Sequence, residues 1–107
     1  MARPRPFRIL YAPVVSEHLR VIPRKHHGLI KEGIEVHLAA EPDRESTSRR
    51  LLSPTTELEA EWELRSGPKN MVRVFYGVDA RLRIVHIVAI GVKRGNRLTI
   101  GRDEVKL

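Results

Sequence analysis

Three strand-like runs in the last third of the chain constrain the fold more than any other feature. Residues 59–65 and 72–79 alternate apolar and polar side chains, and residues 82–92 are apolar at most positions. Because successive side chains of a strand point to opposite faces, the first two runs predict half-buried strands. The apolar run predicts a central strand. Turn-forming residues separate the runs, so together they predict a three-stranded antiparallel meander.

The first half of the chain predicts one more strand and two helices. Residues 7–11 alternate well enough for a short first strand. Ser16 is a candidate N-cap for a short helix that ends before Pro23. Residues 24–40 carry an apolar stripe at helical spacing, which predicts a second helix. Two helices joined at Pro23 would form an αα-hairpin.

The remaining segments lack a periodic apolar pattern. Residues 1–6 are interpreted as a flexible tail and residues 41–56, rich in Pro, Ser and charged side chains, as a linker. Residues 103–107 are interpreted as a final helical turn or a frayed end. The chain of 107 residues is predicted to be one α+β domain, in which the first strand completes a four-stranded sheet.

Composition favours a polyanionic partner. The net charge is +7, and the positive excess lies at the two ends of the chain and in the second half of the predicted sheet. There is no cysteine, which suits a reducing compartment, and no apolar run long enough for a membrane span. We therefore expect a cytoplasmic protein without membrane association. No nucleotide-binding fingerprint or Ser/His/Asp set is present, and no cofactor is expected.

The order of these segments resembles the RelE/ParE family of bacterial toxins. The resemblance rests on Leu64-Arg65 closing one strand, on the Val-Arg-Val-Phe-Tyr run at 72–76, and on an apolar strand that closes in Lys93-Arg94. It covers roughly residues 7–97. It implies the family's strand, αα-hairpin and meander, and the role of toxin in a type II toxin–antitoxin module. The implied partner is a cognate antitoxin protein.

Within this family the resemblance implies first a metal-independent endoribonuclease that cleaves mRNA on the ribosome and inhibits translation. Other members inhibit DNA gyrase without nuclease activity, and this alternative stays open. A basic RNA-binding protein without catalysis is the third alternative, and it does not depend on the family.

The candidate site follows from the same motifs. By resemblance, Arg73 and Arg94 bind the phosphate that is cleaved, because a guanidinium matches phosphate oxygens. The best-known ribonuclease member has two lysines where this chain has Glu61 and Glu63. These carboxylates are candidate general bases, or they repel phosphate. That member's C-terminal tyrosine is also missing, so the acid is unassigned.

Three further cations, Arg65, Lys93 and Arg97, are candidate substrate-binding residues. We expect Trp62 to face the helices with Leu64, while Glu61, Glu63 and Arg73 face solvent.

Five histidines are present, and their spacing does not predict a metal site. His86 lies within the apolar run 82–92 and is predicted to be a hydrogen-bonded histidine of the core.

Overall fold

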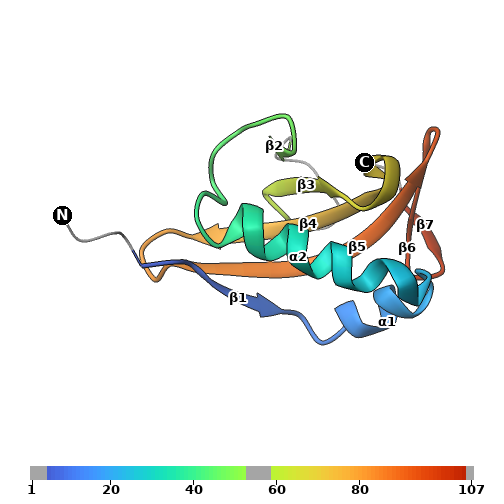
Figure 1. Cartoon of the computed structure of the whole chain (residues 1–107), viewed down its shortest axis with the longest axis horizontal. Coiled ribbons are helices and arrows are strands. Elements are labelled where there is room, and N and C mark those ends of the chain that lie inside the picture. Colours follow the sequence, from blue (N-terminus) through green and yellow to red (C-terminus); the bar gives the residue numbers. More distant parts are fainter. Residues whose placement is uncertain (1–4, 53–58, 106–107) are drawn as a thin grey trace.

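The computed structural model describes residues 5–52 and 59–105, which form an α+β fold with two α-helices and a seven-stranded, mostly antiparallel open sheet (Figure 1). The α-helices are α1 (Val15–Arg20) and α2 (His27–Leu38), and short 3-10 helices span Arg24–His26 and Pro68–Asn70. The strands are β1 (Arg8–Tyr11), β2 (Arg49–Leu51), β3 (Trp62–Ser66), β4 (Val72–Asp79), β5 (Ile84–Arg94), β6 (Arg97–Ile100) and β7 (Asp103–Val105).

The predicted meander is β3, β4 and β5, which pair antiparallel in that order. β1 lies parallel to the first half of β5, from Arg8 opposite Ile84 to Tyr11 opposite Ile87. β6 lies antiparallel to the second half of β5. β5 is therefore flanked by strands on both sides except at residues 88–90, which explains its apolar sequence.

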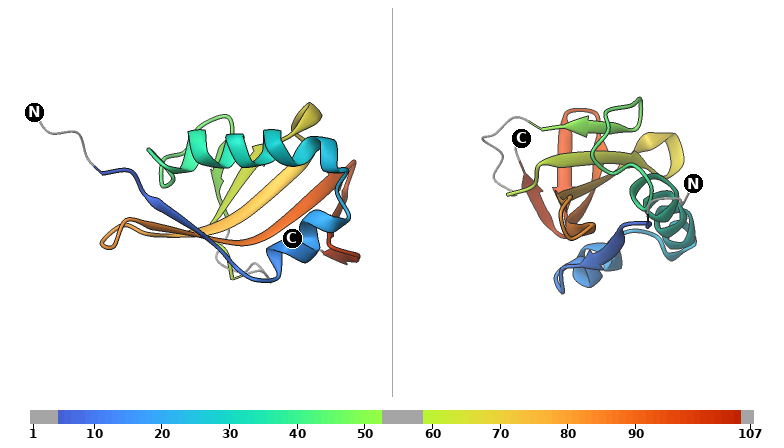
Figure 2. Two further views of the ribbon diagram at one scale, coloured as in Figure 1. Left: turned by 60° about the horizontal axis from the view of Figure 1, so that its bottom comes forward. Right: turned by 90° about the vertical axis from the view of Figure 1, so that its left-hand side faces the viewer.

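α2 covers one face of the sheet (Figure 2). Ile30, Ile34 and Leu38 recur every fourth residue and are at most 1% exposed, so they form the stripe that packs on the strands. Trp62 is buried in the same core and stacks on Tyr76, with ring centroids 6.3 Å apart. The prediction that Trp62 faces the helices is confirmed.

The helices pack mainly on different strands, α1 on β5 and α2 on β3. The close approach of α2 to β3 occurs at Gly33, where a Cβ atom would lie 2.6 Å from the Ser66 hydroxyl. The glycine therefore serves packing between helix and sheet. α1 begins at Val15, and Ser16 is not its N-cap, because the Ser16 hydroxyl donates to the Pro13 carbonyl at 3.1 Å.

A β-bulge in β5 overturns the predicted position of His86. Phe75 pairs with Ala89 but Tyr76 pairs with Ile87, so Val88 is an extra residue in β5. The bulge exchanges the two faces of the strand. His86 is consequently exposed, and the prediction of a core histidine is wrong.

Several irregular segments turn out to be strands. The predicted linker 41–56 contains β2, which pairs with β3, and residues 53–58 lie outside the described residues. Residues 103–107 were predicted to be a helical turn or a frayed end, but Asp103–Val105 form strand β7, and residues 106–107 lie outside the described residues. Of the predicted tail 1–6, residues 1–4 are also undescribed.

β6 and β7 help to enclose a second, smaller core on the face opposite α2. Its buried residues are Ala60, Phe75, Ala89, Leu98 and Ile100. Both faces of the sheet are therefore apolar near its centre, and polar groups on the second face must be accommodated among buried neighbours.

Candidate functional site

Basic side chains surround a hollow of about 410 Å³ between the β3–β4 turn and the β5–β6 hairpin. Its lining, here called the basic hollow, consists of Lys69, Asn70, Met71, Arg73, Lys93, Arg94 and Gly95. The Lys93 backbone N–H donates to the Met71 carbonyl at 2.7 Å, which ties the two segments together. Four of the seven lining residues are cations, so the hollow suits an anionic ligand.

The β3–β4 turn presents Lys69 through an uncommon backbone conformation. Lys69 and Asn70 have φ of 54° and 55°, in the left-handed region that asparagine tolerates better than lysine. Gly67 precedes them with φ of 73°. Lys69 was not singled out by the sequence reasoning, although its turn joins two strands that each carry a candidate arginine.

Arg73 contributes one wall of the basic hollow and is held there by a buried carboxylate. Its Nη1 lies 2.8 Å from Glu63 Oε1, and its Nε donates to the Asn70 carbonyl at 3.2 Å. The Glu63 side chain is 1% exposed and the Arg73 side chain 11%. The prediction that Glu63 and Arg73 face solvent is therefore wrong.

Glu63 can be buried because arginines from three strands surround it. Besides Arg73 on β4, Arg50 of β2 lies 3.5 Å away and Arg65 of β3 lies 3.9 Å away. Both of these side chains are more exposed than Arg73, at 54% and 40%. A buried carboxylate requires such partners because desolvation of an unpaired charge is costly. Glu63 thus organises the arginines and does not reach the open side of the hollow.

Glu61 lies outside the basic hollow. Its Oε1 accepts a hydrogen bond from the Val78 backbone N–H at 3.3 Å. Val78 is five residues from Arg73 along β4, which corresponds to about 16 Å at the rise of an extended strand. The structure therefore separates Glu61 from the cations with which it was grouped.

Lys93 and Arg94 reach the basic hollow from opposite faces of the β5–β6 hairpin. Gly91 pairs with Arg73, and Lys93, two residues further, shares that face of the sheet. Arg94 pairs with Arg97 on the other face and reaches the hollow at the end of the hairpin. Among the described residues, Arg73, Lys93 and Arg94 are thus brought together, while Arg65 and Arg97 lie outside the lining.

The side chains of Lys69, Lys93 and Arg94 make no hydrogen bond or ion pair within residues 5–52 and 59–105. By contrast, Arg73 pairs with Glu63, and the Arg97 Nε lies 3.9 Å from a Glu104 carboxylate oxygen. Three cations of the hollow can therefore bind a ligand without first breaking an internal pair.

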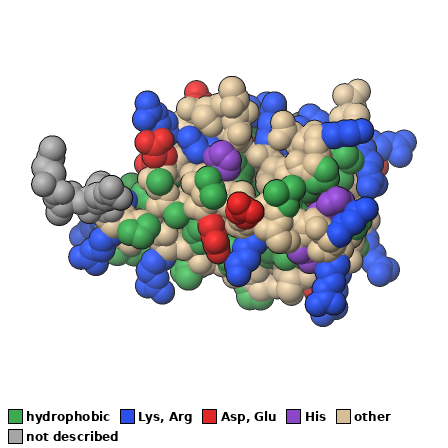
Figure 3. Space-filling view, viewed as in Figure 1, with side chains coloured by type: hydrophobic (Ala, Val, Ile, Leu, Met, Phe, Trp, Pro, Cys, Tyr) green, Lys and Arg blue, Asp and Glu red, His purple; other side chains and the backbone are tan. Residues whose placement is uncertain are grey.

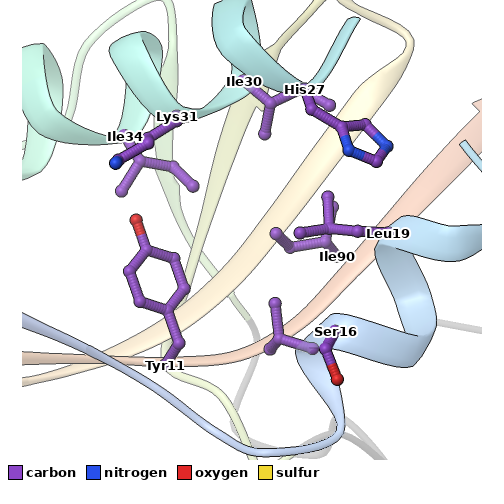
Figure 4. Close-up of a pocket in the computed structure, with 9 residues that line it drawn as sticks. Tyr11, Ser16, Leu19, His27, Ile30, Lys31, Ile34 and Ile90 are labelled. Atoms are coloured by element: carbon purple, nitrogen blue, oxygen red, sulfur yellow. The ribbon is translucent and has the colours of Figure 1, made fainter. Parts of the chain in front are cut away.

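A separate apolar groove of about 300 Å³ lies between β1, α1 and α2 (Figure 4). Leu19 and Ile90 line its floor, and the Tyr11 ring points toward Ile34 and Lys31 on α2. Burial, with a smaller contribution from Glu35, raises the pKa of Tyr11 above its ordinary value. Five of the nine lining residues are aliphatic, so the groove is a surface for apolar groups.

His18 anchors α1 to the sheet. It is 8% exposed, and its Nδ1 accepts a hydrogen bond from the Ile90 backbone N–H at 3.2 Å. Burial lowers the pKa of His18, against a smaller opposing effect of Glu17. Because Nδ1 must stay unprotonated to accept this bond, His18 is structural and neutral.

No cluster of three or more His, Asp or Glu side chains within the described ranges could hold a metal ion. No described helix is long and apolar enough to cross a membrane. Comparisons with protein-family models, with curated proteins and with solved structures found no significant match.

Proposed function

We propose that this chain is the toxin of a type II toxin–antitoxin module, of the RelE/ParE kind, and that it acts on RNA whose phosphates bind in the basic hollow. The observation that carries the proposal is the shared lining by Arg73, Lys93 and Arg94, which come from two short motifs on the adjacent strands β4 and β5. The order of β1, two helices and the β3–β5 meander is the order that the resemblance implies, extended here by β2, β6 and β7.

The proposed reaction is cleavage of a phosphodiester on ribosome-bound mRNA. The ribose 2′-oxygen forms a bond to the adjacent phosphorus, the bond to the 5′-oxygen breaks, and the proton of the 2′-hydroxyl is balanced by protonation of the leaving oxygen. Lys69, Lys93 and Arg94 would stabilise the charge that grows on the phosphate oxygens. Arg73 would orient the phosphate with the part of its guanidinium that Glu63 does not occupy. No metal is required for these steps.

Neither candidate carboxylate lines the basic hollow, where a proton would be transferred. Glu63 is buried against its arginines, and Glu61 lies at the far end of β4. The lining of the basic hollow contains no carboxylate and no histidine. Because the lining offers no such group to transfer a proton, two second candidates gain support. They are inhibition of DNA gyrase without nuclease chemistry and RNA binding without cleavage.

The proposed partner is an antitoxin with an acidic segment. Such a segment would cover Arg94 at the edge of the basic hollow, attracted by the net charge of +7. An apolar side chain of the same partner fits the groove between β1, α1 and α2. Co-purification with the product of an adjacent gene should give a complex that survives high salt, since apolar contacts are not screened.

The decisive experiment measures ribosome-bound mRNA cleavage and gyrase supercoiling side by side. Lys93→Ala and Arg94→Ala are the test variants, because both side chains line the hollow without internal partners. Each should lower cleavage about 10²-fold, by analogy with the loss of one oxyanion donor. Arg81→Ala, at an exposed turn outside the hollow, is the matched control and should cleave like wild type.

If the protein inhibits gyrase and leaves mRNA intact, its function would be that of the gyrase-inhibiting members of the family. RNA binding without either activity would support the non-catalytic alternative. A folded wild type that neither binds RNA nor inhibits gyrase would overturn the proposal.

A further inference from the structure

Beyond the basic hollow, two more hollows continue around the same end of the molecule. The middle hollow, about 390 Å³, is lined by Val21, Pro23, Val92, Arg94, Arg97, Thr99 and Gly101. The outer hollow, also about 390 Å³, is lined by Val14, Glu17, His18, Arg20, Val21, Ile100, Gly101, Arg102 and Asp103. Arg94 lines both the basic and the middle hollow, and Val21 and Gly101 line both the middle and the outer one. The three hollows therefore adjoin in a row.

Lys and Arg side chains gather at this end of the molecule, where α1, the start of α2 and the β5–β6 hairpin lie (Figure 3). Exposed cations border the row from the basic hollow, through Arg94 and Arg97, to Arg20 and Arg102. The charged residues that line the basic and middle hollows are all cations, which matches the charge of a phosphate backbone, whereas the outer hollow also carries Glu17 and Asp103.

The middle hollow differs from its neighbours because one of its walls is apolar. Val21 is 43% exposed, and it lies beside exposed Pro23 and half-buried Val92. These side chains offer aliphatic surface to a flat ligand. A phosphate gains nothing from such a wall, since burying a charge against apolar groups is unfavourable.

The β5–β6 register places the polar groups of the middle hollow on the same face of the hairpin as Val92. Arg94 pairs with Arg97 and Val92 pairs with Thr99, so all four side chains lie on one face of the hairpin. Two arginines directly opposite each other repel, and only Arg97 has an internal carboxylate, Glu104, at the long distance of 3.9 Å. A ligand that places negative charge beside Arg94 would relieve this repulsion.

We propose that the middle hollow binds one unpaired nucleobase of the RNA strand whose phosphate occupies the basic hollow. The base packs against Val21 and Pro23, an arginine plane covers its other side, and the Thr99 hydroxyl hydrogen-bonds its edge. Unpaired bases are recognised in this way, by stacking on planar or apolar side chains and by contacts to their edges. The base subsite rests on the proposed action on RNA and adds a readout of single-stranded substrate.

An acidic peptide is the competing occupant, because its carboxylates would also pair with Arg94 and Arg97. The observations favour the base, since the hollow combines a broad apolar wall with a hydroxyl that both donates and accepts. A carboxylate would gain nothing from contact with the apolar wall. It also only accepts hydrogen bonds, whereas the edge of a base both donates and accepts them.

The test compares binding of a short oligouridylate with that of an abasic ribose-phosphate oligomer of equal length, by fluorescence anisotropy on the full chain. Both probes carry the same charge, so they differ only in the bases. Wild type should bind oligouridylate about tenfold more tightly, the expected contribution of one stacked base. Val21→Ser should remove most of this difference and leave the affinity for the abasic oligomer unchanged.

Val36→Ser on α2 is the matched control, because Val36 is 65% exposed and lines none of the three hollows. It should keep the tenfold preference, and thermal unfolding should show both serine variants folded. Equal affinity of wild type for the two probes would overturn the base subsite while leaving the proposed function intact. If polyglutamate displaces oligouridylate from wild type and does so less well from Val21→Ser, the middle hollow would be assigned to an acidic peptide. Failure to bind either probe would overturn the proposed action on RNA.

Discussion

Replacing Arg73 by methionine is expected to lower the free energy of unfolding by about 3 kcal/mol. Methionine keeps the length of the side chain but leaves the Glu63 carboxylate, 1% exposed, without its 2.8 Å partner. Removing one member of a buried ion pair costs about 3–5 kcal/mol. The lower end applies here because Arg50 and Arg65 remain near Glu63 at 3.5 and 3.9 Å, although their side chains are about half exposed.

The double variant separates the charge from the packing. In Glu63→Met with Arg73→Met, both charges disappear and two apolar side chains occupy the site, a change that is often neutral or stabilising. The double variant should therefore be no less stable than Arg73→Met alone. The resulting coupling free energy should exceed about 1 kcal/mol, as expected for residues in direct contact.

Urea unfolding followed by the fluorescence of Trp62, which is buried in the core, measures these differences. Arg81→Met is the control, because Arg81 is exposed, and it should stay within about 0.5 kcal/mol of wild type. The reasoning is refuted if Arg73→Met is as mild as this control, or if the two single substitutions simply add.

Three further expectations concern the fold. Because burial lowers the pKa of His18 below its ordinary value of 6.5, the unfolded chain takes up the proton more readily. The contribution of His18 to the free energy of unfolding should thus be fully present above pH 6.5. It should fall on acidification by at most about 1.4 kcal/mol per pH unit, and urea unfolding of His18→Asn should not show this fall. Gly33→Ala should destabilise through contact with the Ser66 hydroxyl, whereas Gly28→Ala, with open space at its Cβ, should stabilise by about 0.5–1 kcal/mol. Adding Ser66→Ala to Gly33→Ala should restore stability, and no recovery would contradict the packing argument. Trp62→Ala should cost about 3–5 kcal/mol in urea unfolding followed by far-ultraviolet circular dichroism, because the chain has one tryptophan, and a cost below about 1 kcal/mol would mean that the stacked ring contributes little.

The meander was predictable from the sequence because its strands bury one apolar face each. The alternation of apolar and polar residues at 72–79 predicted the observed bounds of β4. The same kind of alternation at 59–65 predicted that Trp62 faces the helices. β2, β6 and β7 are short and carry few apolar residues, so no period marks them. They form because neighbouring strands offer backbone partners, which a single segment does not reveal.

The candidate site was predictable only in part. Arg73, Lys93 and Arg94 could be grouped because their motifs lie on adjacent strands, and they do line one hollow. The burial of Glu63 depends on arginines from three strands, and the exposure of His86 depends on a bulge at Val88. Both are properties of pairing register, which strand periodicity alone does not specify.

The parallel pairing of β1 with β5 also has a consequence for synthesis on the ribosome. β1 is translated before the other six described strands, yet its partner β5 is the fifth of the seven to be made. Until Arg94 has been added, the apolar side of α2 has no completed sheet to cover. Such distant pairing slows folding, because the whole intervening chain must close as one loop. The paired elements should therefore acquire their structure only after β5 has been translated, and an mRNA truncated before the β5 codons should yield no folded fragment.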